Sequence, residues 1–348
     1  MTGDIGIGLL GFGMAGRVFH APLIAATPGL RLTAIATRHA DAARAACPDA
    51  RIVPDAAALL ADPAVALVVV ATPSHLHQEH AAMALRAGRH IVVEKPFALS
   101  LAGAEELAAL ARVAQRQLFV FHNRRWDSDF LAIRAAIDSG LVGDVVHFES
   151  HFDRFRPQVR ARWREDGSPG SGVWLDLGPH LVDQALCLFG PPAAVTADLA
   201  VLRADGQSDD WAHVVLHWPG RRAVLHASMV VAGGSPRFTV HGTRGSLVKH
   251  GLDQQEAQLV AGLRPGDADW GRDDDPLLCW DSTGRQSQHR APRGGQQAFY
   301  HHVWQALTGT GAPPNTLDEA LMVQRVIAAA QASARDGRTV WLDGHTQS

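Results

Sequence analysis

Cysteine is scarce in this sequence. Only three of its 348 residues are cysteines, Cys47, Cys187 and Cys279, and no two of them form a CxxC pair. Thiols that are this few and this far apart argue against a disulfide framework and against a structural zinc site. The same pattern is typical of a reducing cytoplasm, which is where we expect the chain to act.

The sequence also lacks a strong excess of charge and long apolar runs. Its formal net charge is −3, so no overall basic field attracts nucleic acid or an anionic membrane. The N-terminal region carries Asp4 and no basic leader, and the apolar run Ile5–Leu10 is too short for a signal peptide or a membrane span. We therefore expect partners that are neither nucleic acids nor membranes.

What the sequence does contain is an alternation of apolar runs and Ala-rich stretches over its first third. A chain of 348 residues exceeds what one core usually covers, so two domains are expected. Runs that are apolar on consecutive positions are typical of strands covered on both faces, and they alternate here with segments of helical composition. The pattern predicts an α/β fold with a doubly wound, mostly parallel sheet over residues 1–122. The runs are Ile5–Leu10, Leu30–Ala36, Leu67–Ala71, His90–Val93 and Leu118–Phe121.

Residues 123–348 have a different pattern of apolar runs. Several strand-like runs, joined by turns, predict one larger and mainly antiparallel sheet. These runs are Val145–Asp153, Ala193–Leu202, Trp211–Trp218, Arg222–Val231, Arg237–His241 and Ser246–Lys249. An apolar helix is expected over Leu181–Phe189 and an irregular segment over residues 262–293.

A glycine-rich turn follows the first apolar run. Its GxGxxG pattern comes directly after a predicted strand and opens a predicted helix, which is the context of a dinucleotide-binding turn. The first glycine permits the tight turn, the second lets backbone N–H groups approach a pyrophosphate, and the third lets the helix pack close to the sheet. A merely structural turn is the alternative interpretation. The residues concerned are Gly11, Phe12, Gly13, Met14, Ala15 and Gly16.

The end of the run Leu30–Ala36 bears on the choice of cofactor. An acidic residue at this place would bind the ribose 2′-hydroxyl of NAD, but the sequence has Thr37 and Arg38 there. A guanidinium makes paired, charge-assisted hydrogen bonds to phosphate, so NADP is favoured and NAD stays possible. The alternative is that Arg38 is a solvated loop residue.

Two further motifs give the chain a family resemblance. They are Glu94-Lys95-Pro96 and the segment Trp174-Leu-Asp176-Leu-Gly178-Pro-His180-Leu-Val-Asp183. Together with the glycine turn, they resemble the Gfo/Idh/MocA family of sugar and cyclitol oxidoreductases over essentially the whole chain. Further segments, such as Arg17-Val-Phe-His20-Ala-Pro22, are similar to the branch of this family that contains bacterial scyllo-inositol dehydrogenases and YdgJ-type oxidoreductases.

The resemblance implies a fold and an assembly. It implies an N-terminal Rossmann domain that binds the dinucleotide, residues 1–122, and a second α/β domain that binds substrate and forms oligomers, residues 123–348. In the family, the open face of the second sheet often forms a subunit interface. A homodimer or homotetramer is therefore expected.

The resemblance also implies the catalytic residues. Lys95 follows a strand end, where its cation can stabilise a developing alkoxide. His180 is the expected acid/base, because an imidazole ordinarily titrates near pH ~6.5, and Asp176 four residues earlier would lie on the same helical face. The alternatives are that Lys95 is a surface lysine with its charged end in solvent, that Asp176 caps a helix, and that His180 is a core histidine whose hydrogen bonds are satisfied. Asp183 is either a substrate contact or a polar helix position.

Further contacts are expected around these residues. Those to the cofactor come from Thr72, Pro73, His75, His77, Glu94, Lys95, Trp163 and Arg164. Those to substrate hydroxyls come from Lys95, Asn123, Arg124, Asp153, Arg156, Asp176 and His180. His75, His77 and His80 form an HxHxxH pattern, but a strand-to-helix junction explains it better than a metal, so no metal is expected.

The function that these patterns predict is an NAD(P)-dependent dehydrogenase. It would move hydride between nicotinamide and a secondary hydroxyl or carbonyl of a cyclitol or sugar, with scyllo-inositol-type substrates foremost. An aldose dehydrogenase or carbonyl reductase with the same residues is the first alternative. A non-catalytic dinucleotide-sensing regulator is the second.

Overall fold

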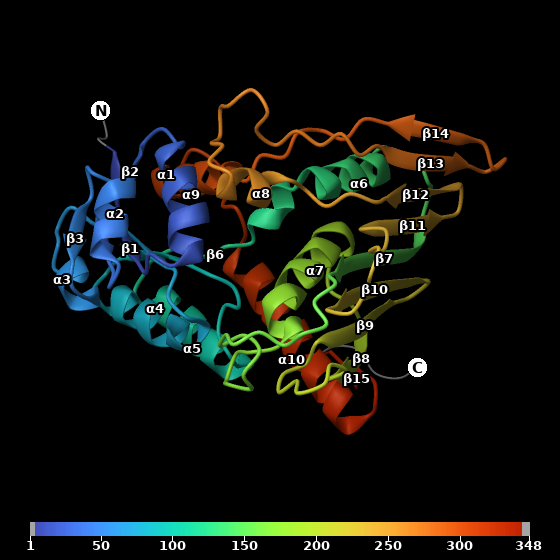
Figure 1. Cartoon of the computed structure of the whole chain (residues 1–348), viewed down its shortest axis with the longest axis horizontal. Coiled ribbons are helices and arrows are strands. Elements are labelled where there is room, and N and C mark those ends of the chain that lie inside the picture. Colours follow the sequence, from blue (N-terminus) through green and yellow to red (C-terminus); the bar gives the residue numbers. More distant parts are fainter. Residues whose placement is uncertain (1–3, 343–348) are drawn as a thin grey trace. The chain divides into compact units, whose positions relative to one another are not determined.

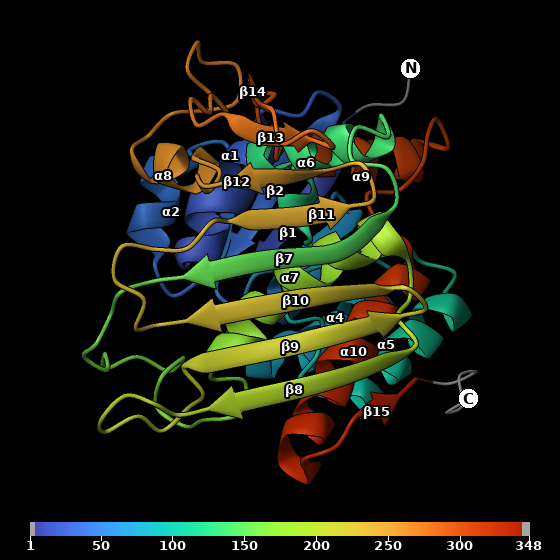
Figure 2. The ribbon, with the colours of Figure 1, turned by 90° about the vertical axis from the view of Figure 1, so that its right-hand side faces the viewer.

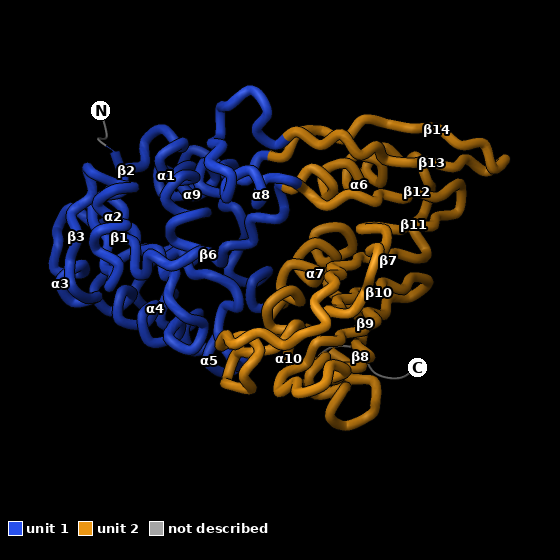
Figure 3. The backbone as a smooth tube through the Cα atoms, in the orientation of Figure 1, with its two compact units in different colours: residues 1–126, 254–271, 295–321 blue, residues 127–253, 272–294, 322–348 orange. Residues whose placement is uncertain are grey.

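The chain forms two compact units, each assembled from separate segments. In the computed structural model, which describes residues 4–342, unit 1 comprises residues 1–126, 254–271 and 295–321 (Figure 3). Unit 2 comprises residues 127–253, 272–294 and 322–348. Two late segments therefore pack with the N-terminal part. The functional division into residues 1–122 for the cofactor and 123–348 for substrate and oligomerisation stays a prediction.

Unit 1 is built on a six-stranded sheet in the order β3-β2-β1-β4-β5-β6, with all neighbouring pairs parallel (Figure 1). The expected doubly wound parallel sheet is confirmed. The order reverses between β1 and β4, and such a switch point is where open parallel sheets bind ligands, beyond the carboxyl ends of the strands. The strands are β1 (Ile5–Leu10), β2 (Leu30–Ala36), β3 (Arg51–Val53), β4 (Leu67–Val70), β5 (His90–Val93) and β6 (Leu118–Val120).

Helices cover both faces of this sheet, which is why its strands are apolar on consecutive positions. Val68 and Val70 belong to one buried cluster, whereas Val69 between them belongs to another. The second cluster also takes Phe299 and Tyr300 from a late helix, α9. The helices of unit 1 are α1 (Ala21–Ala25), α2 (Ala40–Ala46), α3 (Ala56–Leu60), α4 (His77–Arg86), α5 (Leu101–Val113), α8 (Gln255–Val260) and α9 (Ala298–Thr308).

Unit 2 holds a nine-stranded sheet in the order β14-β13-β12-β11-β7-β10-β9-β8-β15 (Figure 2). Every neighbouring pair is antiparallel except β7 with β10, so the expected mainly antiparallel sheet is confirmed. The strands are β7 (Val145–Asp153), β8 (Ala194–Ala200), β9 (Trp211–Trp218), β10 (Arg221–Ser228), β11 (Phe238–Gly242), β12 (Gly245–Lys249), β13 (Leu277–Asp281), β14 (Gln286–His289) and β15 (Val340–Trp341).

Two expectations for this half were wrong. Residues 262–293, expected to be irregular, contain β13 and β14. The helix expected to begin at Leu181 begins eight residues earlier, at Val173, and runs through Gly178 and Pro179 to Phe189. The second correction matters for function because it brings Asp176 and His180 into one regular helix.

Among residues 4–342, the helices of unit 2 lie on one face of this sheet. Helix α6 (Ser128–Asp138), helix α7 (Val173–Phe189) and the part of α10 (Leu317–Asp336) in this unit lie behind the strands in Figure 2. Phe148 and Phe152 of β7 join their core, and the alternating residues between them point to the other side. We call that side the open face; it carries His147, Glu149, His151 and Asp153 of β7, Trp211, His213 and His217 of β9, and His226 of β10. The expected dimer or tetramer through this face stays a prediction.

Within residues 4–342, no helix is both long enough and apolar enough to cross a bilayer.

Candidate functional site

The glycine turn joins β1 to a helical segment that starts as a π-helix over Ala15–His20 and continues into α1. Gly11 has φ +97°, and a Cβ atom there would lie 2.5 Å from the carbonyl oxygen of Ala71. A Cβ atom on Gly16 would collide with the carbonyl oxygen of Gly11. The first and third glycines are therefore required by the fold itself.

The middle glycine is different. A Cβ atom built on Gly13 meets no atom within 4 Å among the described residues, and Gly13 and Met14 are exposed. Open space beside a glycine backbone at the start of a helix suits the close approach of a pyrophosphate. The side chain of Phe12 is buried in the core, so only its backbone is available to a ligand. The residues present thus fit a dinucleotide.

The predicted cofactor-selecting residues lie beside this turn. The Gly11 N–H donates to the carbonyl of Ala36, the last residue of β2, at 2.9 Å. Thr37 follows and accepts a hydrogen bond from the backbone N–H of His39 at 3.0 Å. Arg38 is exposed, with no acidic residue in the segment Ala36–His39. The contact of Thr37 and Arg38 with the cofactor stays a prediction.

Glu94 is the centre of a buried hydrogen-bond chain. Its Oε1 lies 3.1 Å from Nε2 of His20, and Nδ1 of His20 lies 2.6 Å from the hydroxyl of Tyr300. Burial alone would raise the pKa of Glu94, but His20 and then Lys95 lower it overall. The ionised carboxylate accepts a hydrogen bond from Nε2–H of His20, and the other ring nitrogen pairs with the Tyr300 hydroxyl.

The hydrogen-bond network around Glu94 also holds the backbone of Lys95. The second carboxylate oxygen of Glu94 accepts the Lys95 N–H at 3.0 Å. The Glu94 carboxylate thus accepts hydrogen bonds from the Lys95 backbone and from His20. Its expected contact with the cofactor stays a prediction. Sequence reasoning missed Tyr300, because 280 residues separate it from His20 and no local pattern links them.

The HxHxxH histidines do not converge. Nδ1 of His77 lies 2.8 Å from the Pro96 carbonyl and Nε2 lies 2.9 Å from the Thr72 carbonyl, so the ring joins the loops that follow β4 and β5. Burial lowers the pKa of His77, and the hydrogen bonds to the Pro96 and Thr72 carbonyls oppose that effect. Nδ1 of His80 lies 3.1 Å from the Thr72 hydroxyl, and His75 sits on the preceding 3₁₀ turn, Ser74–Leu76.

Helix α7 carries the expected acid/base pair. Asp176 and His180 lie one turn apart on the same face, and Asp183 follows at the next turn. His180 is 5% exposed and Asp183 2%, whereas Asp176 is half-buried. Gly178 is required within the helix because a Cβ atom would lie 2.7 Å from the Trp174 ring. The helix thus presents a carboxylate and an imidazole together.

The expected Trp163–Arg164 pair lies with this helix in unit 2. Nε of Arg164 is 3.3 Å from Oδ1 of Asp176, and its guanidinium stacks 4.4 Å from the centre of the Trp163 ring. Asp176 is therefore linked to both residues before any ligand binds. The contact of this pair with the cofactor stays a prediction.

Asp209 caps the start of α7, and sequence reasoning missed it. Its carboxylate accepts the Trp174 N–H at 2.7 Å, and its backbone carbonyl accepts the Val173 N–H at 2.8 Å. Burial above all, with the nearby charge of Asp210, raises the pKa of Asp209 to about 6 despite these hydrogen bonds. Asp209 is 35 residues from Trp174, so the sequence holds no local signal of this cap.

We expect Asp209→Asn to remove a pH dependence of stability. The folded chain holds the Asp209 proton up to about pH 6, whereas the unfolded chain loses it near its ordinary value of 3.8. This group therefore stabilises the fold fully below about pH 4, and the contribution is lost as the pH rises through about 6. The variant should be the more stable protein at pH 7.5, by at most about 3 kcal/mol. Urea unfolding of both proteins from pH 4 to 7.5 measures the difference, and a constant difference across that range would contradict the assignment.

The four remaining candidates for substrate binding are divided between the units. In unit 1, Asn123 donates to Gln296 at 2.9 Å and Arg124 pairs with Glu256 at 2.7 Å, so both are tied to late segments of the chain. In unit 2, Arg156 is half-buried just after β7, where its carbonyl accepts from Arg203 at 3.0 Å. Asp153 lies on the open face, whereas α7 packs on the opposite face.

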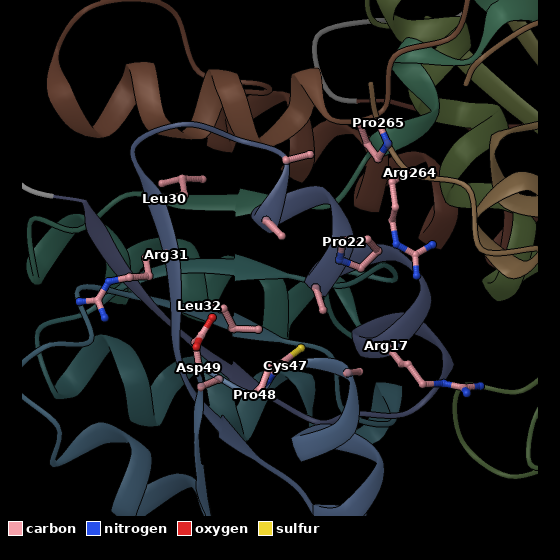
Figure 4. Close-up of a pocket in the computed structure, with 15 residues that line it drawn as sticks. Arg17, Pro22, Leu30, Arg31, Leu32, Cys47, Pro48, Asp49, Arg264 and Pro265 are labelled. Carbon is pink, nitrogen blue, oxygen red and sulfur yellow. The ribbon is translucent and has the colours of Figure 1, made fainter. Parts of the chain in front are cut away.

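A pocket of about 590 Å³ lies on unit 1 between α1, β2 and α2 (Figure 4). Its lining includes Arg17, Cys47, Asp49 and Arg264, and none of the three turn glycines or Lys95. Burial raises the pKa of the Cys47 thiol, which makes it a poor nucleophile. This pocket is therefore separate from the dinucleotide-binding turn.

Comparisons with known proteins cover both parts of the chain. Residues 5–122 match the Gfo/Idh/MocA model described as an oxidoreductase family NAD-binding Rossmann fold, and residues 134–342 match the model of the C-terminal alpha/beta domain. The chain is 46% identical over 349 residues to the uncharacterized oxidoreductase YdgJ of Escherichia coli strain K12, covering 98% of this chain and 100% of that protein. It is 37% identical over 347 residues to the scyllo-inositol 2-dehydrogenase (NADP(+)) IolW of Bacillus subtilis strain 168, covering 97% and 96%.

Solved structures agree in fold. The chain matches a crystal structure of an oxidoreductase from Klebsiella pneumoniae with a TM-score of 0.92 and 48% identity, covering 98% of this chain and 96% of that one. It matches the oxidoreductase yvaA from Bacillus subtilis with a TM-score of 0.95 and 35% identity, covering 98% and 99%.

Proposed function

Because this chain belongs to the Gfo/Idh/MocA family and is an NAD(P)-dependent oxidoreductase, we propose that it acts on a secondary hydroxyl or carbonyl group of a cyclitol or sugar. The first substrates to consider are scyllo-inositol-type cyclitols, since the printed name of one relative specifies such a substrate for that protein. The observation that carries the proposal is the pairing of Asp176 with His180 on one face of α7.

Each proposed residue has a chemical task. His180 accepts the proton of the substrate hydroxyl during oxidation and returns it during reduction. Asp176 orients the imidazole or holds a neighbouring substrate hydroxyl. Lys95, held through its backbone by Glu94, stabilises negative charge on the reacting oxygen. A bound nicotinamide supplies the hydride acceptor or donor for this chemistry.

The proposed cofactor is NADP, with NAD as the alternative. Gly11, Gly13 and Gly16 give the backbone access that a pyrophosphate needs. Thr37 and Arg38 stand where an acidic residue would favour NAD, and a guanidinium suits a 2′-phosphate. The NADP named for the relative IolW is consistent with this choice.

A substrate screen tests the proposal. The purified chain is offered scyllo-inositol, myo-inositol and a set of aldoses with NADP or NAD, in both reaction directions, and reduced nicotinamide is followed by absorbance. We expect the highest kcat/KM for a cyclitol with NADP, and a loss of the preference for NADP in Arg38→Ala. Higher kcat/KM for an aldose would favour the aldose dehydrogenase.

One outcome would point away from an enzyme. Tight dinucleotide binding without turnover of any substrate in either direction would support a dinucleotide-sensing regulator. The presence of Lys95, Asp176 and His180 together argues against this outcome, because a sensor has no need of a proton acceptor.

A further inference from the structure

We propose that His151, Asp153 and His226 form a binding site for a divalent transition-metal ion on the open face of the nine-stranded sheet. One ligand atom from each of these side chains lies within 4.8 Å of the others. Two imidazoles and one carboxylate are a ligand set that Zn²⁺ and related ions prefer. The proposal does not rest on the oxidoreductase function proposed above.

The backbone of two central strands fixes the positions of the three ligands. Strands β7 and β10 are parallel, and their register pairs His151 directly with His226. Asp153 is two residues further along β7, so the alternation of side chains puts it on the same face. Ligands held by paired strands are more rigid than ligands on loops, which favours a defined metal geometry.

The distances between ligand atoms are close to those of an occupied site. Nδ1 of His151 is 3.3 Å from Oδ2 of Asp153, and Nε2 of His226 is 3.6 Å from Oδ1 of the same carboxylate. In a tetrahedral zinc site with bonds of about 2.0–2.1 Å, neighbouring ligand atoms are about 3.3 Å apart. All three ligand atoms lie within 4.8 Å of one another, so side-chain rotations that shorten the longer separations would complete the site around an ion.

The remaining ring nitrogens are held by neighbours. Nε2 of His151 lies 3.1 Å from a carboxylate oxygen of Glu149, and Nδ1 of His226 lies 3.4 Å from Nδ1 of His213. Metal-binding histidines almost always donate a hydrogen bond from the N–H of their other ring nitrogen, because this contact fixes the tautomer. When His151 donates from Nε2 to Glu149, the lone pair of Nδ1 faces Asp153.

The alternative is a protonated His151 held between two carboxylates without any metal. Burial disfavours its charge, but Asp153 and Glu149 raise the pKa of His151 overall. In that alternative a protonated His151 pairs with Asp153 Oδ2 at 3.3 Å, and hydrogen bonds from His151 and Ser235 lower the pKa of Asp153. The second carboxylate oxygen, Oδ1, lies 3.6 Å from Nε2 of His226, and an ion bound between the three side chains would bring this third group into the site as well.

Zinc titration of the full chain tests the proposal. Protein treated with a chelator and then dialysed is titrated with Zn²⁺ at pH 7.5 against a chromophoric competitor. We expect one Zn²⁺ per chain, with a dissociation constant of about 1 μM or below. Affinity should fall at pH 6, because a proton then competes for His151. Bound Co²⁺ should show the visible absorption of a site with nitrogen and oxygen ligands.

Variants distinguish this site from unspecific binding to the other histidines. His226→Gln and Asp153→Asn should each weaken Zn²⁺ binding by at least about 100-fold, and Glu149→Gln by about 10- to 100-fold. His217→Gln is the matched control, because His217 lies on the same face but is hydrogen-bonded to Thr196 at 2.9 Å. If Asp153→Asn does not fold, the Zn²⁺ affinities of His226→Gln and Glu149→Gln decide whether the site exists. A wild-type chain that binds no Zn²⁺, or variants that bind it equally well, would overturn the proposal.

Discussion

Replacing Lys95 with alanine should lower kcat by about 10²- to 10³-fold, because the developing charge on the reacting oxygen then loses its cation. His180→Asn should lower kcat by about 10²- to 10⁴-fold, because proton transfer loses its acceptor. The double variant should be little worse than the worse single variant, since the two groups serve one step. Steady-state kinetics with the best substrate of the screen measures these effects.

Binding measurements separate this loss of chemistry from a loss of the fold. We expect the affinity for the dinucleotide to stay within about tenfold of wild type in each variant, as measured by nicotinamide fluorescence. Near-normal turnover of the double variant would show that these residues are not catalytic.

Chemical modification gives a second measurement for Lys95. The chain has only two lysines, Lys95 and Lys249. Lys249 is fully buried and paired with Asp273 and Asp275, at 3.1 and 2.6 Å. Reductive methylation of the folded protein should therefore modify Lys95 with high selectivity among lysines, and the loss of turnover should follow the extent of its modification.

Gly13→Val should weaken dinucleotide binding by about 100-fold, equivalent to about 2.7 kcal/mol, without weakening the fold. A Cβ atom built on Gly13 meets no atom within 4 Å among residues 4–342, so the fold leaves room for a side chain there. It would instead occupy the space that a pyrophosphate needs next to the backbone. Isothermal titration with NADP and NAD, together with urea unfolding, measures the two quantities.

Gly16→Ala is the matched comparison for Gly13→Val. Its Cβ atom would collide with the backbone carbonyl of Gly11, which cannot move without shifting the turn. We expect this variant to lose about 1–3 kcal/mol of stability as well as affinity. If Gly13→Val bound dinucleotides as wild type does, the space beside Gly13 would not be the phosphate site.

The parallel sheet of unit 1 was predictable because its strands carry their own signal. Burial on both faces makes β1 and β5 nearly continuous apolar runs, whereas β2 is buried only at Leu30 and over its last three residues; all three strands have the bounds that the sequence predicts. Strand β3 was missed because it begins with the exposed Arg51 and leaves only Ile52 and Val53 as an apolar signal. Strand β14 was missed because all four of its residues are exposed and polar.

The parts of the site that could be predicted are those whose residues are close in sequence. The glycine turn and the Asp176/His180 spacing belong to one turn and one helix, so local chemistry reveals them. Asp209 and Tyr300 could not be found, because only tertiary structure brings them to Trp174 and His20. The same holds for His151 and His226, which become neighbours only through the pairing of β7 with β10.

The return of α9 to unit 1 also has a consequence for synthesis of the chain. Phe299 and Tyr300 fill the same core as Ile7 and Leu9, but Tyr300 leaves the ribosome 280 residues after His20. At roughly 5–20 residues per second, the N-terminal strands wait about 14–56 s for their last covering helix. During that interval one side of the nascent sheet exposes apolar surface, which makes the growing chain a natural client for chaperones that act during translation.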